Sequence, residues 1–192
     1  MTTKEPRTEP VTQPYSDEVA NELGRWMPPN SPVEPLALFR TLCRNLELAR
    51  AMRPLGEFQL SKRSSLSIRV RELVVDRTTA RLGAEYEWGV HAVAYGAAAG
   101  LSDTELANTV LGTSHDFDTV SGLVVEMVDQ LIDTYTVSDG LWASLSGEFS
   151  DEEILELIVL CGWYHIIAFV VNAARVAPEP WAATFPSAKA AS

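Results

Sequence analysis

Apolar residues recur every three or four positions along most of the chain, which is the spacing of one face of an α-helix. No stretch alternates between apolar and polar residues with the period of two that is typical of a half-buried strand. The pattern therefore predicts an all-α protein. The predicted helices cover residues 17–23, 36–46, a short segment around 58–60, 69–82, 84–95, 103–111, 120–134, a short segment around 142, and 151–176.

Helix starts and ends are marked by residues with known capping roles. Ser102–Glu105 and Ser150–Glu153 each have the pattern of a capping box, in which a serine and a glutamate satisfy each other's backbone donors. Gly83 separates the two central helices, and Gly100 suits a left-handed position after a helix. Pro54 is expected to interrupt the helical pattern before residue 58.

The chain is long enough for one domain with a proper core, at 192 residues. Residues 1–34 mix proline, threonine and acidic residues and are predicted to form an N-terminal arm. Residues 35–178 carry the helical pattern and are predicted to form the domain. Residues 179–192, which follow two prolines, are predicted to be a C-terminal tail.

The formal net charge of −11 argues against nucleic-acid binding, which needs clustered positive charge. The N-terminus has no apolar segment of the kind that signal peptides carry. Residues 157–171 lack charges but are fewer than the ~20 that a membrane span needs, so a buried helix is expected there. Cys43 and Cys161 are far apart and are expected to be reduced thiols in a cytoplasmic protein.

The candidate chemistry lies on the two central helices. On the second of them, residues three or four apart bring Glu87, Trp88, His91 and Tyr95 onto one stripe. On the first, Glu72 is the lone ionisable group in an otherwise largely apolar stripe. A buried carboxylate must find a partner or hold a proton. We therefore expect Glu72, Glu87 and His91 to meet in one pocket.

Glu87 and His91 can act together in three ways. They can form a general acid/base pair, in which the carboxylate orients the imidazole and raises its proton affinity. They can be two ligands of a metal. They can also be a helix-surface pair of little energetic weight. The metal alternative lacks the doubled Glu-x-x-His pattern of di-iron bundles and the His-Glu-x-x-His pattern of zinc sites.

The last helix carries two polar residues, His165 and Asn172, on a stripe that otherwise resembles a core. One interpretation is a buried histidine that is hydrogen-bonded to the backbone or to Asn172. The other is that this face forms the roof of the pocket that holds Glu72, Glu87 and His91.

Several motifs in this order resemble the carboxymuconolactone decarboxylase family, which also contains alkylhydroperoxidase D. The motifs are Arg71-Glu72-Leu, Gly83-Ala-Glu-Tyr-Glu-Trp-Gly-Val-His91, Ala98-Ala-Gly-Leu-Ser-Asp-x-Glu-Leu, Trp163-Tyr-His165 and Asn172. The likeness covers roughly residues 36–178. It implies an all-helical fold that assembles as trimers or hexamers, with pockets near subunit contacts.

The resemblance also bears on the chemistry. In the peroxidase branch a helix carries Cys-x-x-Cys-x-x-x-His with an upstream glutamate; the histidine matches His91 and the glutamate matches Glu72. The two cysteine positions fall on Ala84 and Glu87. A carboxylate cannot replace the thiolate that attacks a peroxide, so thiol peroxidase activity is not expected. An acid/base site that resembles the cofactor-free decarboxylase branch remains.

The leading hypothesis is a cofactor-free lyase or isomerase that acts on a small oxygenated organic acid or lactone, with no metal. His91 would be the acid/base group, Glu87 and Glu72 its carboxylates, and His165 a group that polarises the substrate. The residues expected to line the substrate site are Trp88, Tyr95 and Asn172. The arginines considered for substrate carboxylates are Arg40, Arg44, Arg71 and Arg81.

Two alternatives stay open beside this hypothesis. The first is a non-catalytic helical oligomer that binds a ligand or a partner. The second is a metal-dependent enzyme that uses Glu87 and His91. The expected partners are a small-molecule substrate and further copies of the chain, as a dimer, trimer or hexamer, without nucleic acid or membrane.

Overall fold

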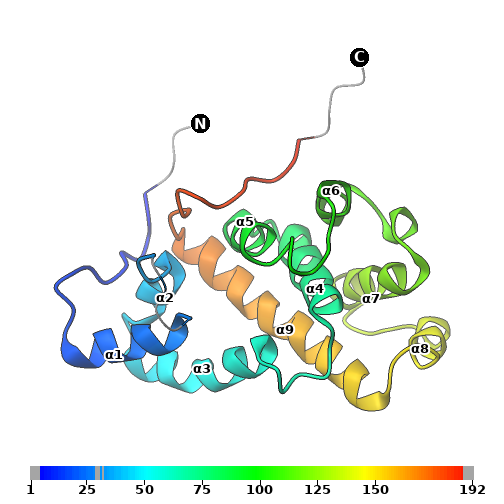
Figure 1. The fold of residues 1–192 in the computed structure, drawn as a ribbon, viewed down its shortest axis with the longest axis horizontal. Helices are drawn as coiled ribbons and strands as arrows, with labels where there is room; N and C mark the ends of the chain where they lie inside the picture. The colour runs from blue at the N-terminus through cyan, green and yellow to red at the C-terminus, as the bar shows by residue number, and fades with distance from the viewer. Residues whose placement is uncertain (1–4, 29–30, 32, 188–192) are drawn as a thin grey trace. The chain divides into compact units, whose positions relative to one another are not determined.

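The structure, a computed structural model, describes residues 5–28, 31 and 33–187; the ends of the predicted arm and tail lie outside these ranges. Helices joined by turns, bends and irregular segments make up this part of the chain, and no strand occurs in it (Figure 1). The prediction of an all-α protein is confirmed.

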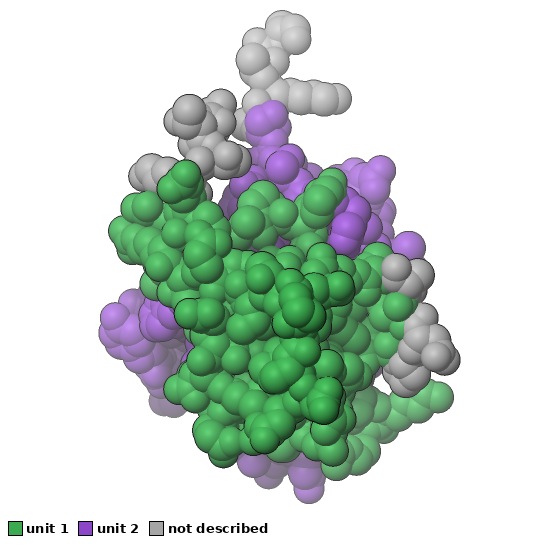
Figure 2. Space-filling view, turned by 90° about the vertical axis from the view of Figure 1, so that its left-hand side faces the viewer, with its two compact units in different colours: residues 1–64, 170–180 green, residues 65–169, 181–192 purple. Residues whose placement is uncertain are grey.

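Contacts group the chain into two compact units, coloured separately in Figure 2. Unit 1 comprises Met1–Ser64 and Val170–Pro180, and unit 2 comprises Ser65–Phe169 and Trp181–Ser192. These boundaries differ from the predicted limits at residues 34 and 178. Grouping by contacts does not test where an independently folded domain begins and ends, so the division into arm, domain and tail stays a prediction.

Unit 1 contains α1 (Asp17–Trp26), α2 (Ala37–Leu42) and α3 (Leu46–Leu60). The expected interruption at Pro54 is wrong, because Pro54 lies inside α3. A proline removes one backbone donor, and packing against a neighbouring helix can offset that loss. Here α3 contacts α1, and Arg53 of α3 forms an ion pair with the buried Glu22 of α1 at 2.9 Å.

Unit 2 contains α4 (Ile68–Arg81), α5 (Glu85–Ala94), α6 (Asp103–Leu111), the 3-10 turn η1 (Ser114–Asp116), α7 (Thr119–Thr134), α8 (Asp139–Leu145) and most of α9 (Asp151–Ala174). Gly83 and Gly100 have φ values of +64° and +66°, which confirms both as left-handed positions. Both predicted capping boxes form. The helix α5 ends at Ala94, and hydrogen-bonded turns continue to Gly100.

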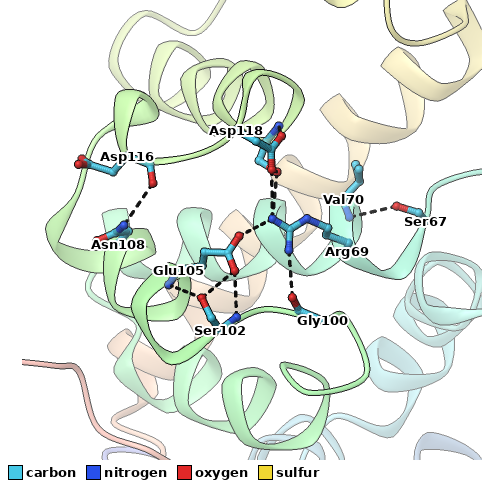
Figure 3. A network of polar contacts seen from close by, with 10 residues as sticks. Ser67, Arg69, Val70, Gly100, Ser102, Glu105, Asn108, Asp116 and Asp118 are labelled. Carbon is cyan, nitrogen blue, oxygen red and sulfur yellow. Dashed lines mark hydrogen bonds and ion pairs between the residues drawn. The ribbon is translucent and has the colours of Figure 1, made fainter.

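The helix α4 is the centre of unit 2, because every residue from Arg71 to Thr79 is buried. It packs against α5, α6 and α7 (Figure 1). Arg69 at its start is held by Glu105 of α6, by the Gly100 carbonyl at 3.2 Å and by Asp118 before α7 at 3.2 Å (Figure 3). This network fixes the N-terminal end of α4, and with it the helix turn that carries Glu72.

Among the described residues, α9 is long and apolar enough to cross a bilayer by length and composition, and half of its most apolar window is buried. The helix has 24 residues and is therefore longer than its uncharged run, residues 157–171. The core helix of a soluble protein passes the same test, so this feature is weak evidence for a membrane.

Candidate active site

The centre of the site is an ion pair between two helices. Glu72 of α4 and His91 of α5 are both buried, and Glu72 Oε2 lies 2.6 Å from His91 Nδ1. The other oxygen of Glu72 accepts a hydrogen bond from Arg71 Nε at 3.0 Å. The carboxylate of Glu72 thus fixes the orientation of the imidazole ring and determines which ring nitrogen faces the other side chains.

The second nitrogen of the imidazole faces two further side chains. His91 Nε2 lies 3.1 Å from the hydroxyl of Tyr164 and 3.6 Å from Glu87 Oε1. The longer separation is that of an ion pair rather than of a hydrogen bond. Glu72, Glu87 and His91 therefore converge, with Tyr164 as a fourth member, and all four side chains are buried. That they line a pocket stays a prediction.

The two members of the ion pair shift each other's proton affinity. Burial disfavours a charged imidazole, but the carboxylate of Glu72, aided by Glu87, outweighs burial and raises the pKa of His91 well above its ordinary value. Burial likewise disfavours a charged Glu72, yet His91 and Arg71 outweigh it and lower the pKa of Glu72. Each partner thus favours the charged form of the other, an imidazolium beside a carboxylate.

Two acidic side chains near this pair have oxygens without a hydrogen-bond partner among the described residues. Both oxygens of Asp76 and Oε2 of Glu87 are buried in this state. Asp76 follows Glu72 by one helical turn on α4. Burial, reinforced by the charge of Glu72 and opposed by that of His91, raises the pKa of Asp76 well above its ordinary value. Burial thus favours the protonated form of Asp76.

Replacing Asp76 with asparagine is expected to stabilise the protein increasingly as pH rises. Because the pKa of Asp76 is raised on folding, proton binding stabilises the wild type fully below about pH 3.9, the pKa of an unfolded aspartate. This stabilisation is lost as pH rises from there to the pKa in the folded protein. The loss amounts to about 1.4 kcal/mol per pH unit over that window, and asparagine does not incur it. Urea unfolding at several pH values measures the difference. An exposed control, Asp103→Asn, should follow the wild type, and a pH-independent difference for Asp76→Asn would contradict the interpretation.

Tyr95 and Trp88, both predicted for the substrate site, have different neighbours in the structure. The ring of Tyr95 lies beside that of His91, with centroids 5.0 Å apart. The indole of Trp88 donates to Thr109 Oγ1 at 3.0 Å and packs on Phe185, so it belongs to the packing of α5 against α6 and the tail. Its predicted place in the substrate site is not supported by these contacts.

The expected roof of the site is also corrected. His165 packs its ring edge-to-face on Phe169 at 4.7 Å, and Asn172 is exposed and belongs to unit 1. The helix α9 contributes through Tyr164 instead. Leu157, Leu160 and Tyr164 lie on the buried face of α9. His165 is one residue further along the helix, so its side chain points about 100° away from that of Tyr164.

Tyr164 and Asp76 were not predicted as site residues. Tyr164 directly precedes His165 in the motif, so a shift of one residue in helical phase separates the two assignments. Asp76 could have been found from its spacing of four residues from Glu72 on the same helix.

Neither cysteine is suited to thiolate chemistry. Cys43 in unit 1 and Cys161 in unit 2 are free and buried. Burial raises the pKa of Cys43 to about 11 and also raises the pKa of Cys161. A thiol needs a lowered pKa to act as a nucleophile near neutral pH. Within the described ranges, no group of three or more His, Cys, Asp and Glu side chains is arranged to hold a metal ion.

Residues 183–185 of the predicted C-terminal tail lie against α5. Ala183 donates its backbone N–H to the Gly89 carbonyl at 3.2 Å, and Phe185 donates to Glu85 at 2.8 Å. A Cβ atom at Gly89 would lie 2.0 Å from the Ala183 carbonyl oxygen, so this approach requires glycine. Glu85 and Gly89 are four residues apart on the helix that carries His91.

Solved structures share this fold. An uncharacterised peroxidase-related protein from Silicibacter sp. TM1040 superposes with a TM-score of 0.75 at 17% identity, over 94% of this chain and 95% of its own. A protein of unknown function from Agrobacterium tumefaciens, suggested to be an AhpD antioxidant defence protein, superposes with a TM-score of 0.60 at 20% identity, over 72% of this chain and 94% of its own.

No family model and no curated protein sequence matches the chain. At these identities the structural likeness establishes the fold, which is AhpD-like, in agreement with the resemblance drawn from the motifs.

Proposed function

We propose that the protein is a cofactor-free acid/base enzyme that acts on a small oxygenated organic acid or lactone. The observation that carries the proposal is His91, whose two ring nitrogens are each engaged by buried side chains from a different helix: Glu72 on Nδ1 and Tyr164 on Nε2. An imidazole held in this way has a fixed orientation and a controlled proton.

In the proposed reaction, His91 donates its Nε2 proton to a carbon atom of the substrate. If the substrate loses carbon dioxide, the electron pair of the broken C–C bond is delocalised onto a neighbouring carbonyl as an enolate. The imidazolium then protonates the enolate carbon and becomes neutral. In an isomerisation the imidazolium first protonates one carbon atom of the substrate, and the neutral imidazole that results then removes a proton from another. Glu72 keeps the ring oriented and offsets its positive charge in both cases.

Glu87 would relay the proton, because Oε1 faces His91 and Oε2 has no partner among the described residues. A buried carboxylate oxygen without a partner is costly, and a substrate hydroxyl or a water molecule would satisfy it. The thiol alternative is disfavoured by the buried cysteines and by Glu87 itself, which occupies a position where the resemblance expects a cysteine.

The test is solvent exchange on small lactone acids and enol acids in D₂O, followed by proton NMR. Wild-type protein is expected to exchange the C–H next to the carbonyl of at least one member of the panel. Glu87→Gln should slow that exchange by about 10²-fold, the lower range for loss of a proton-transfer group. Glu85→Gln is the matched control, because Glu85 lies on the same helix and is exposed.

The burial of the cluster favours a second candidate, a non-catalytic helical protein in which the same residues only stabilise the core. In that case no member of the panel exchanges, and Glu87→Gln changes stability alone. Equal exchange rates for wild type and Glu87→Gln would also contradict the proposed relay. A metal-dependent enzyme that uses Glu87 and His91 would instead show a stoichiometric metal in elemental analysis of the purified protein.

A further inference from the structure

Unit 1 contains a cavity of about 270 Å³. Its wall is formed by part of the predicted N-terminal arm, by the start of α1 and by the turn between α2 and α3, which supplies Arg44. Every lining residue belongs to the segment Met1–Ser64, so the cavity is formed within one unit. Thr12, Pro14 and Ser16 on the wall are exposed, so the cavity is open to solvent. It is slightly smaller than the pockets that bind drug-sized molecules, and it therefore suits a smaller ligand.

Hydrogen bonds hold the arm in place beside the cavity. The Val11 N–H donates to the Arg40 carbonyl oxygen at 3.2 Å, and the Tyr15 hydroxyl donates to Glu34 Oε1 at 3.1 Å. Arg40 in turn donates from Nε to the Pro35 carbonyl oxygen at 3.0 Å. The wall is thus formed before a ligand binds, which lowers the cost of ordering it on binding.

Most of the wall is apolar. The lining residues of this kind are Pro10, Val11, Pro14, Tyr15 and Val19. Water gains little from contact with such surfaces, so an apolar group that displaces it binds favourably. The body of a ligand for this cavity is therefore expected to be apolar.

Arg44 places a positive charge on the same wall. Three other arginines on or near α2 and α3 form ion pairs with glutamates; these are Arg40, Arg50 and Arg53. By contrast, the Arg44 side chain makes no ion pair or hydrogen bond with another described residue. A guanidinium presents parallel N–H donors that match the two oxygens of a carboxylate. An anionic group in the cavity would meet a cation for which no described acid competes.

The polar side chains on the wall are hydrogen-bond donors as well. Ser16 caps α1, and its Oγ accepts from the Val19 N–H at 3.4 Å, so its own hydroxyl hydrogen is available to a ligand. Within the described ranges the Thr12 hydroxyl has no hydrogen-bond partner. The acids of the first turn of α1, Asp17 and Glu18, do not line the cavity. The wall therefore attracts a negative charge and carries no acidic side chain.

We propose that this cavity binds a small monocarboxylic acid with an apolar body. Its carboxylate pairs with Arg44, and its body packs against the two prolines and Val19. A fully hydrophilic anion such as phosphate can pair with Arg44 but leaves the apolar part of the wall without a contact. The inference does not rest on the acid/base chemistry proposed for His91, which belongs to unit 2.

The charge is tested with benzoate and hexanoate as probes in ligand-observed NMR titrations. Both are expected to bind the wild type in the millimolar range, as suits ligands of this size. Benzyl alcohol keeps the ring of benzoate without the charge and should bind about tenfold more weakly, the low end for a hydrogen bond to a charged group. Arg44→Gln should weaken benzoate binding by the same factor. Arg25→Gln is the matched control, because Arg25 is an exposed arginine of α1 that does not line the cavity.

The apolar wall is tested by filling the cavity. Val19→Phe should abolish benzoate binding while Arg44 is retained, and Val33→Phe, at an exposed position of unit 1 that does not line the cavity, should leave it unchanged. Val19 is only partly buried and Arg44 is exposed, so the circular dichroism melts of both variants should match that of the wild type. If one variant unfolds, the other decides.

The position of the probe is read from backbone amide shifts. Benzoate is expected to shift the signals of Thr12, Ser16 and Val19. Shifts confined to the surroundings of His91 would assign benzoate to the proposed acid/base site and overturn this inference alone. Complete displacement of benzoate by inorganic phosphate at the same concentration would mean an adventitious ion only. The inference also fails if neither probe binds, if benzyl alcohol binds as well as benzoate, or if Arg44→Gln or Val19→Phe has no more effect than its control.

Discussion

Replacing Glu72 with glutamine is expected to lower the free energy of unfolding by about 3–5 kcal/mol, the cost of removing one partner from a buried ion pair. Glutamine preserves the shape of the side chain but leaves the charges of Arg71 and His91 without their shared carboxylate. Urea unfolding followed by circular dichroism measures the loss.

The deficit should depend on pH in a defined way. The lowered pKa of Glu72 makes its contribution to stability present above about pH 4.3, the unfolded value, and lost as pH falls through the folded value. The raised pKa of His91 makes its contribution complete below about pH 6.5 and lost as pH rises through the folded value. The deficit of Glu72→Gln is therefore greatest between these two limits.

A surface ion pair supplies the control for Glu72→Gln. Glu47 pairs with Arg50 at 2.6 Å on the exposed side of α3, and Glu47→Gln should leave the unfolding curve unchanged. In addition, the loss for the double variant Glu72→Gln/His91→Gln should be smaller than the sum of the single losses, because the pair is then removed as a unit. Additive losses would show that the two residues do not act together.

Replacing His91 with glutamine is expected to reduce the solvent-exchange rate on the lactone and enol acid panel by 10²–10⁴-fold, the range for loss of a general acid/base group. Glutamine can still hydrogen-bond to Glu72 and Tyr164, but its amide does not act as an acid or a base near neutral pH. Proton NMR in D₂O measures the rate, and circular dichroism confirms that the helices are retained.

His165→Gln is the matched control for His91→Gln. It removes an imidazole from α9, one residue away from Tyr164, and should leave the exchange rate unchanged because His165 packs on Phe169. A loss for His165→Gln as large as that for His91→Gln would restore the role that the sequence first suggested for His165. Unchanged exchange in His91→Gln would refute the acid/base proposal.

The helical positions of the site could be read from the sequence because they follow from local spacing. Glu87 and His91 share a face of α5 whatever the tertiary structure is, and the capping boxes at Ser102 and Ser150 are local as well. The pairing of Glu72 with His91 joins two helices. It was expected because a lone carboxylate in an apolar stripe needs a partner, which is a physical requirement rather than a local pattern.

The assignments that failed depend on tertiary packing. Tyr164 and His165 differ by 100° around α9, and only the packing of the helix decides which of them faces His91. Likewise, a proline usually ends a helix, and the continuation of α3 through Pro54 reflects its contacts with α1. The raised pKa of Asp76 is a consequence of burial that no local pattern reveals.

The contact between the tail and α5 joins residues almost a hundred positions apart. Because Gly89 has no side chain, the backbone of Ala183 can approach it and donate to the Gly89 carbonyl. The ring of Phe185 then packs on Trp88, which lies three residues before His91. Proteolytic removal of residues after Pro180 would uncover this side of α5 and loosen the helix that bears the imidazole. Residues 183–185 are therefore a structural part of unit 2.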